Sequence, residues 1–565
     1  MSPGNSSKPT PTRLCCDEHP ERSHGRLLAL SFVTVYVPEE FTASEADVLR
    51  HYFTNLDLPV FALVNLPEVV KGALFARYSR SPKSLRRLFL DEFVGDLDIS
   101  GDQAVDATIG LERAETLYEK VFFEYGDDSV AQLGGVHLAC EQASNILTKI
   151  LEWGRLMSYL EQSTRYIAYD ERLGGRYRYY RDPDIVAGRF GTRYVGDMDR
   201  MFDSYSALAE SVTEHVRATI PKEKGDSDFV WRQATRAKAL DAVRGALPAA
   251  SLSNVGIYGS GQAFENLLLR MRSHPLPEAR HYSDLMLGEL RKVIPSFLRR
   301  VDLPDRGVLV SDYMEANNRA VADLAERFFG GNIANEVDEV SLVGFDPDGE
   351  NKVIAAALYP QSHLPESQIL SLVDRMSTDD RVSVMRAYVG DRGNRRHRPG
   401  RAFERTDYRF DVLSDYGAFR DLQRHRLLTI EWQGLTPYHG YTKPDLVDAA
   451  GVGDDFDEVM DRSSALYEVL THEHHEQASY AVSMAYRLRY VMQFNAREAM
   501  HMLELRSSPQ GHPSYRRVAL EMHRQIAETA GHRAIAAAMS HMTTEAPELE
   551  RLASERQAER RRDSK

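Results

Sequence analysis

The chain has 565 residues and a formal net charge of −14, from 70 basic and 84 acidic residues. A body this acidic is not expected to coat DNA nonspecifically, and three cysteines are too few for a disulfide framework or a four-cysteine zinc module. With 42% hydrophobic residues and no apolar stretch long enough to span a bilayer, the sequence indicates a globular cytoplasmic protein with no membrane segment and no specific nucleic-acid partner.

The predicted elements are mainly helices with a few strands between them. Residues 1–24 are rich in Ser, Pro and charge and are predicted to be a disordered leader. Apolar and β-branched residues predict strands at 29–37 and 352–358. Apolar periodicity predicts helices over 112–124, 142–160, 265–272 and 498–504, and residues 543–565 form a charged tail. This mixture indicates an α+β fold.

Two polar segments are interpreted as surface features. The loop at 391–401 is basic and punctuated by Gly and Pro, so it is expected to be disordered, with a contact to NADPH, folate or RNA as the alternative. The run His472–Glu476 lacks the spacing of a His-Glu-x-x-His metal site and is interpreted as a solvated helix face. No metal site is predicted.

An internal repeat is visible in the order of the motifs. Residues 150–166 and 421–436 both run from a helical pattern into an Arg-rich turn, and residues 261–275 and 495–509 both form a Leu/Met-rich helix that carries arginine. The same order in each half indicates a diverged tandem duplication. We expect a first repeat at 25–310 and a second at 311–542.

The first half carries residue types suited to a nucleotide phosphate. Glu161, Ser163 and Arg165 alternate at a spacing of two, so in an extended loop they would project from one side. A guanidinium and a hydroxyl on one side could bind a phosphate, and Arg244 lies just before Leu247-Pro248 at an expected helix or turn boundary. The alternative for Glu161 and Arg165 is an i,i+4 ion pair on a helix.

The second half carries a denser set of cationic residues. Arg424, His425 and Arg426 place three donors within one turn, which is enough to hold a phosphate or pyrophosphate. Asn495 can cap a helix on which Arg497 and His501 share a face. The alternatives are a basic surface tripeptide and an ordinary surface pair.

Together these elements resemble the flavin-dependent thymidylate synthases. That family carries Arg-His-Arg, then Ser and Asn-Glu-x-Ser-x-Arg, then Ala-Arg-x-x-Leu-Pro, and an Asn-x-Arg helix that leads to a substrate-activating arginine. In the first half, Trp153-Gly154 stands in place of Arg-His and Leu160 in place of Asn. In the second half, the Ser and Asn-Glu-x-Ser-x-Arg positions hold other residues, namely Thr429, Glu431, Trp432, Gly434 and Thr436. The resemblance implies two tandem repeats of that fold, helix-rich with a small sheet in each.

The losses in the two halves are complementary. The second half keeps the Arg-His-Arg, Asn-x-Arg and activating-arginine elements, and the first half keeps the Glu-x-Ser-x-Arg and Arg-x-x-Leu-Pro elements. The family is a homotetramer with active sites between subunits. The resemblance therefore implies a homodimer that forms a pseudo-tetramer, with two working composite sites and two inactive ones.

The activity implied by the resemblance is reductive C5-methylation of dUMP to dTMP, with methylenetetrahydrofolate, NADPH and FAD. Arg506 would be the catalytic residue that stabilises the ionised uracil, and Arg272 would be its counterpart in an inactive site. The substrate-binding residues would be Ser158, Glu161, Gln162, Ser163, Thr164, Arg165, Arg244 and Arg424. The cofactor-binding residues would be Glu404, Arg424, His425, Arg426, Asn495, Arg497 and His501.

Two other functions stay open at this point. One is a C5-methylase of another pyrimidine nucleotide such as UMP, because the motifs specify phosphate and uracil better than the 2′ position. The other is a noncatalytic protein that keeps a nucleotide- or flavin-binding groove. No cysteine lies in a site motif, so catalysis would depend on the flavin rather than on a cysteine nucleophile.

Overall fold

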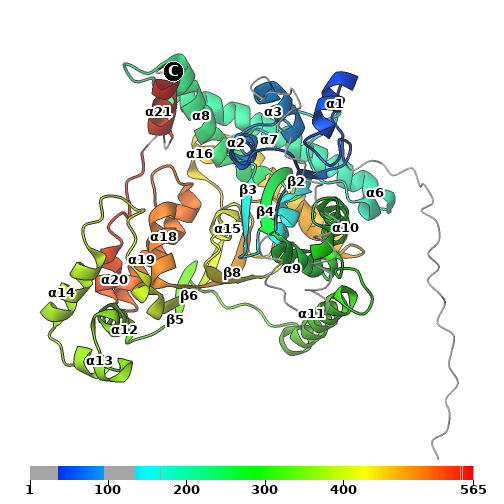
Figure 1. Cartoon of the computed structure of the whole chain (residues 1–565). Helices are drawn as coiled ribbons and strands as arrows, with labels where there is room; N and C mark the ends of the chain where they lie inside the picture. Colours follow the sequence, from blue (N-terminus) through cyan, green and yellow to red (C-terminus); the bar gives the residue numbers. More distant parts are fainter. Residues whose placement is uncertain (1–35, 95–133, 166, 548, 550, 564–565) are drawn as a thin grey trace, which may run out of the picture.

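The computed structural model describes residues 36–94, 134–165, 167–547, 549 and 551–563 (Figure 1). The predicted leader, the helix predicted over 112–124 and most of the strand predicted at 29–37 lie outside these residues. Residues 36 and 37 are not part of a strand. None of the described helices is long and apolar enough to cross a membrane.

Two four-stranded antiparallel sheets organise the chain. The first contains β1 (Val60–Leu63), β2 (Gly135–Ser144), β3 (Met157–Glu161) and β4 (Leu252–Ser260), in the order β1-β2-β4-β3. The second contains β5 (Val340–Phe345), β6 (Asp407–Asp415), β7 (Leu428–Trp432) and β8 (Arg487–Asn495), in the order β5-β6-β8-β7. The identical order confirms two tandem repeats of a helix-rich α+β fold with a small sheet in each.

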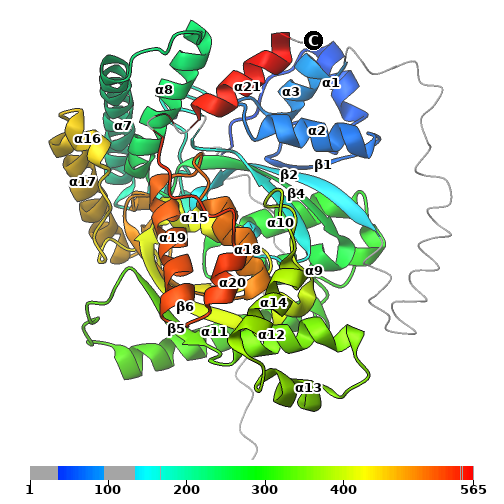
Figure 2. The same cartoon turned by 90° about the vertical axis from the view of Figure 1, so that its left-hand side faces the viewer.

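Helices surround both sheets (Figures 1 and 2). Those up to the end of the predicted first repeat are α1 (Ala43–Arg50), α2 (Glu68–Tyr78), α3 (Leu85–Glu92), α5 (Asn145–Leu151), α6 (Pro183–Ala187), α7 (Gly191–Thr219), α8 (Asp228–Val243), α9 (Gly261–Arg272) and α10 (Pro277–Arg291). The predicted boundary at 310 falls inside α11 (Gly307–Phe329). The later helices are α12 (Gly349–Leu358), α13 (Glu366–Val373), α14 (Thr378–Val389), α15 (Tyr416–Leu422), α16 (Asp445–Ala449), α17 (Gly453–Thr471), α18 (Ala496–Arg506), α19 (Pro513–Glu528), α20 (Arg533–Ala538) and α21 (Leu552–Asp563).

Two predicted elements are wrong in type. The helix predicted over 142–160 is the end of a strand, a short helix and a second strand. The side chain of Ser144 caps α5 by accepting from the amide of Leu147, and that helix ends before the Trp153-Gly154 turn. The strand predicted at 352–358 is helix α12, whose three consecutive alanines favour a helix. In both segments the buried apolar residues do not distinguish a strand from a helix.

The two repeats share one hydrophobic core. Most buried residues of both sheets belong to one large cluster, which includes Leu138 and Met492, whereas Phe61, Leu63 and Ala139 of the first sheet belong to a second, smaller cluster. Residues 245–250 and 480–485 are joined by backbone hydrogen bonds, including Ala249 N to Val482 O at 2.8 Å and Met484 N to Leu247 O at 2.9 Å. Helices α7 and α17 pack side by side (Figure 2). The repeats therefore form one folded unit.

The basic loop and the charged tail are each anchored by ion pairs. Arg392 of the basic loop forms two 2.6 Å contacts with the buried carboxylate of Glu504, so the expectation of a disordered loop is wrong. In the tail, Arg556 of α21 binds Asp226 at 2.6 Å, which places this helix beside α8 (Figure 1). Composition alone did not reveal these acidic partners.

A buried carboxyl group between the repeats predicts a pH-dependent stability. Glu278 accepts hydrogen bonds from Ser144 Oγ at 2.5 Å and Tyr480 Oη at 2.7 Å, and burial raises its pKa to about 7. In the unfolded chain this carboxyl group has its ordinary pKa of about 4.5, so between about pH 4.5 and 7 the folded state holds a proton that the unfolded state has lost. The stability that this group contributes is therefore present in full below pH 4.5 and is lost as the pH rises to about 7.

We expect Glu278→Gln to remove about 3 kcal/mol of this pH dependence, at about 1.4 kcal/mol for each pKa unit. Urea unfolding of the two proteins at pH 5 and pH 8 measures the difference. Equal pH dependence in the variant and the parent protein would contradict the assignment.

Candidate functional site

Four arginines from both repeats surround the buried carboxylate of Asp421 on α15. Arg424 NH2 lies 2.5 Å from Asp421 Oδ1, Arg506 NH1 lies 3.4 Å from the same oxygen, and Arg244 NH1 lies 3.5 Å from Oδ2. Burial alone would raise the pKa of Asp421, but Arg424, Arg506, Arg244 and Arg165 outweigh it and hold the pKa well below its usual range. The structure thus brings together first-repeat and second-repeat residues that the sequence assigned to one site.

Arg165 is held firmly at the edge of this arginine cluster. Its guanidinium contacts Asp241 at 2.7 and 2.5 Å and donates to Tyr515 Oη and Gln510 O, both at 3.1 Å. Although burial acts in the opposite direction, this ion pair lowers the pKa of Asp241 to about 2. Four hydrogen bonds leave one of the five Arg165 N–H groups for a ligand.

Glu161 is the last residue of β3, and its buried side chain forms ion pairs instead of facing solvent. Its carboxylate contacts Arg420 and Lys149, both at 3.0 Å, and Arg424 at 3.6 Å. These cations outweigh burial and lower the pKa of Glu161. The alternative of a helical pair with Arg165 is therefore wrong.

The other substrate-binding residues predicted between 158 and 164 do not all lie beside the arginine cluster. Ser163 Oγ accepts from the Arg165 amide at 3.3 Å, and Thr164 is buried. Gln162 donates to Ser81 O at 2.7 Å and lines a separate cavity, so it does not join the arginine cluster. Ser158 is exposed on β3, where its hydroxyl accepts from Arg426 at 3.2 Å.

A hydrogen-bonded relay leads away from Arg506. Its Nε donates to His425 Nε2 at 3.0 Å, and His425 Nδ1 lies 3.0 Å from Glu498 Oε1. Burial and Arg506 lower the pKa of His425 well below its usual range, so the ring is neutral and can accept from the guanidinium. Burial raises the pKa of Glu498 to about 7.

The same residues form a cluster of possible metal ligands. His425, Glu498 and His501 offer ligand atoms that all lie within 4.8 Å of one another. However, both ring nitrogens of His425 are already in contact with Arg506 and Glu498. We therefore interpret the cluster as a means of positioning Arg506 and not as a metal centre.

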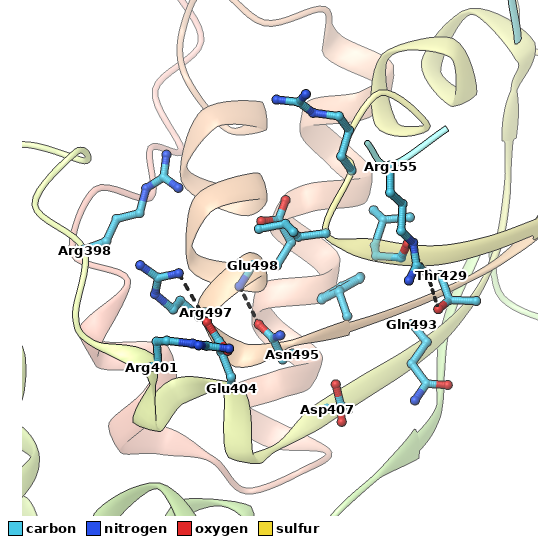
Figure 3. A pocket seen from close by; sticks show the side chains of 14 residues that line it. Arg155, Arg398, Arg401, Glu404, Asp407, Thr429, Gln493, Asn495, Arg497 and Glu498 are labelled. Atoms are coloured by element: carbon cyan, nitrogen blue, oxygen red, sulfur yellow. Dashed lines mark hydrogen bonds and ion pairs between the residues drawn. The ribbon is translucent and has the colours of Figure 1, made fainter. Parts of the chain in front are cut away.

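A cavity of about 490 Å³ opens beside this relay (Figure 3). Arg398, Arg401 and Arg497 lie on one side of it. Glu404 contacts Arg497 at 3.3 Å and Arg401 at 2.9 Å, and Asn495 caps α18 by accepting from the Glu498 amide at 2.9 Å. The predicted cofactor residues Glu404, Arg426, Asn495 and Arg497 all line this cavity, whereas Arg424, His425 and His501 do not. The ring of His501 lies 5.5 Å from that of His425.

Arg426 and Arg155 make matching contacts between the repeats. Arg426 donates to Met157 O and Ser158 Oγ, and Arg155 donates to Leu428 O at 3.0 Å and Thr429 Oγ1 at 2.9 Å. Arg155 and the loop residues Arg398 and Arg401 were not predicted as site residues. For Arg155 a signal existed, because it is the third residue of Trp153-Gly154-Arg155, which corresponds to Arg424-His425-Arg426.

Arg272 does not occupy the position of Arg506. Arg506 is eleven residues beyond its helix cap (506 − 495), whereas Arg272 is twelve beyond the Ser260 cap (272 − 260). One extra residue turns a side chain by about 100° around the helix. Arg272 instead contacts Asp284 at 2.6 Å.

Comparison with known proteins agrees with the two-repeat fold. The family model described as thymidylate synthase complementing protein matches residues 77–296 and 341–531, one region in each repeat. A UPF0159 protein of Chlamydia pneumoniae is 40% identical over 494 residues, which cover 86% of this chain and 93% of that protein. A UPF0159 protein of Thermoplasma acidophilum is 31% identical over 483 residues, covering 81% and 92%. The chain is therefore a member of the thymidylate synthase complementing protein family, in a tandem two-repeat form.

Proposed function

We propose that this protein converts dUMP to dTMP by reductive C5-methylation, with methylenetetrahydrofolate as the carbon donor, NADPH as the reductant and FAD as the bound cofactor. The observation that carries the proposal is the meeting of complementary motifs at Asp421. Arg165 and Arg244 come from the first repeat and Arg424 and Arg506 from the second, so a composite site needs both.

The residues around the 490 Å³ cavity fit an anionic flavin nucleotide. Arg398, Arg401 and Arg497 supply guanidinium groups suited to a pyrophosphate. Glu404 and Pro399 O hold Arg497 in place, which limits the ordering needed on binding. Reduced FAD would supply the hydride for the reaction.

The arginine cluster fits the nucleotide. Arg244 is 4% exposed, and its NH2 nitrogen has no hydrogen-bond partner among the described residues, so it keeps a donor for a phosphate oxygen. Arg506 is aligned by His425 and Asp421, which fixes a permanent positive charge where the ionised uracil would lie. Asp421 offsets the mutual repulsion of the arginines.

The number of FAD molecules bound per chain tests whether each chain contributes one working site. Because the intact flavin elements occur in the second repeat alone, we expect about one FAD per chain after reconstitution, measured by absorbance after gel filtration. Two FAD per chain would contradict the complementary arrangement. Formation of dTMP from dUMP, compared with methylation of UMP under the same conditions, tests the reaction itself.

We also propose that the full chain is a cytoplasmic homodimer. On α11, Tyr313, Val321 and Phe328 are each more than 60% exposed, and a helix with such an apolar face is marginal in water without a partner. A second copy of the chain would cover it. Analytical ultracentrifugation of the full chain measures its mass in solution. A monomer at micromolar concentration would contradict this assembly.

A further inference from the structure

Tyr515 on α19 lies against two arginines of the cluster around Asp421. Its hydroxyl accepts a hydrogen bond from Arg165 NH1 at 3.1 Å. The guanidinium carbon of Arg506 lies 5.4 Å from the centroid of its ring, and that of Arg165 lies 6.0 Å from it. Tyr515 is 4% exposed. One buried side chain of the second repeat therefore contacts an arginine from each repeat, and none of the sequence motifs contains it.

The hydrogen bonds of Arg165 show what Tyr515 does to that side chain. Arg165 Nε and NH2 donate to the two carboxylate oxygens of Asp241, and NH2 also donates to Gln510 O at 3.1 Å. A guanidinium has five N–H groups, two of which are on NH1. Because Tyr515 accepts from one of these two, the other NH1 hydrogen is the one left for a ligand among the described contacts. Tyr515 thereby fixes the direction in which Arg165 can donate.

The start of α19 is docked onto the first repeat, which holds Tyr515 in place. His512 precedes this helix, and its Nδ1 accepts from Ser514 N at 3.2 Å while its Nε2 donates to Asp241 O at 3.0 Å. Burial lowers the pKa of His512 to about 3, so the ring is neutral and can make both contacts. Asp241 therefore positions Arg165 through its carboxylate and α19 through its carbonyl group.

Gly511 allows the ring of Tyr515 to pack closely on the loop before α19. A Cβ atom at position 511 would lie 2.8 Å from Tyr515 Cε2 and 2.9 Å from Ser508 O. Any other residue would have to displace the ring or the loop backbone. The packing thus leaves the ring little freedom to move.

The first repeat lacks this arrangement. Helices α10 and α19 both begin with proline, and the residue two positions later is Ala279 in the first repeat and Tyr515 in the second. The loop before α10 has four residues (273–276), whereas the loop before α19 has six (507–512). The tyrosine and the longer loop therefore occur in the same repeat as Arg506.

A tyrosine suits this position because its oxygen accepts a hydrogen bond without adding charge. Asp241 and Asp421 already offset part of the positive charge of the arginine cluster. A third acid would leave less positive charge for a phosphate, whereas a phenol oxygen accepts from a guanidinium and is uncharged at neutral pH. The ring also attracts the guanidinium of Arg506.

We propose that Tyr515 is a positioning residue that aligns the nucleotide, because its hydroxyl selects the N–H of Arg165 that meets the phosphate and its ring supports Arg506. The identification of the ligand as a nucleotide monophosphate rests on the proposed function. Loss of the hydroxyl frees the second NH1 hydrogen of Arg165. The phosphate then binds in more than one orientation, so binding stays strong while the base is misplaced relative to Arg506.

Tyr515→Phe in the full FAD-containing chain removes the hydroxyl and keeps the ring. We expect kcat with dUMP to fall about tenfold, because a small misplacement of a reactant has an effect of this size or larger. The dissociation constant of dUMP, measured by calorimetry, should stay within about twofold, since both NH1 hydrogens can then reach the phosphate. The phosphorus NMR resonance of bound dUMP should shift, and FAD content should equal that of the parent chain.

Tyr486→Phe is the matched control. Tyr486 is also 4% exposed, and its hydroxyl donates to Met460 O at 2.7 Å. This variant should keep the kcat and the phosphorus resonance of the parent chain. In a chain that carries Arg165→Ala, Tyr515→Phe should have no further effect on kcat, because the hydroxyl acts through Arg165.

The outcomes separate this inference from the proposed function. Tyr515→Phe with the kcat and phosphorus resonance of the parent would overturn the inference even if the parent forms dTMP. An equal loss of kcat in Tyr486→Phe, or a further loss on the Arg165→Ala background, would also overturn it. A phosphorus shift that depends on Tyr515, without dTMP formation, would support the positioning role and count against the proposed reaction. The absence of dUMP binding to the parent chain would overturn both.

Discussion

Arg506→Ala is expected to lower kcat by about 10²–10³ while the purified protein keeps its FAD, because a preorganised donor to a developing anion typically contributes this much. The structure gives Arg506 no direct role in the 490 Å³ cavity, so cofactor content should not change. Its guanidinium is fixed by His425 at 3.0 Å and Asp421 at 3.4 Å. Steady-state kinetics with dUMP, together with visible absorbance of the flavin, measures both quantities.

Arg272→Ala is the matched control for this experiment. Arg272 ends the corresponding helix of the first repeat but contacts Asp284, with a side chain that is 26% exposed. Its loss should change kcat by less than about twofold, since surface ion pairs contribute little. A larger loss of activity in Arg272→Ala than in Arg506→Ala would contradict the assignment of Arg506 as the activating arginine.

The sequence predicted the duplication because motif order survives divergence. Asn495 was predicted to cap a helix, and the structure confirms this contact with the Glu498 amide. Arg244, Arg424 and Arg506 meet as the complementary losses implied. These predictions rest on the spacing of neighbouring residues or on which motif residues each half of the chain keeps, and both are visible in one sequence.

Other features depend on partners distant in sequence and could not be predicted in the same way. Asp421 is an ordinary helical acid in the sequence, yet it lies among four arginines from both repeats. Likewise, the basic loop at 391–401 was expected to be disordered because it is basic and punctuated by Gly and Pro, and its ion pair between Arg392 and Glu504 joins residues 112 positions apart. The helix predicted over 142–160 failed because buried strands and buried helices are both apolar.

Separation of the two repeats is expected to abolish activity, whereas cleavage of the connection between them is not. Residues 330–338 are all exposed and join α11 to β5. If a protease site is placed there and cut after folding, the two fragments should remain together on gel filtration and keep activity within about twofold. Fragments 1–332 and 333–565 expressed separately should each be inactive.

Cleavage at 330–338 leaves the contacts between the two repeats intact. Four backbone hydrogen bonds between residues 245–250 and 480–485 (2.8–3.1 Å) and one shared core hold the repeats together without the linker. A separate fragment would expose that core and would hold either Arg165 and Arg244 or Arg424 and Arg506, but not all four. Uncut chain carrying the inserted protease site is the control, because it isolates the effect of cleavage from that of the insertion. Activity in either isolated fragment would show that one repeat contains a complete site, which contradicts the composite arrangement around Asp421.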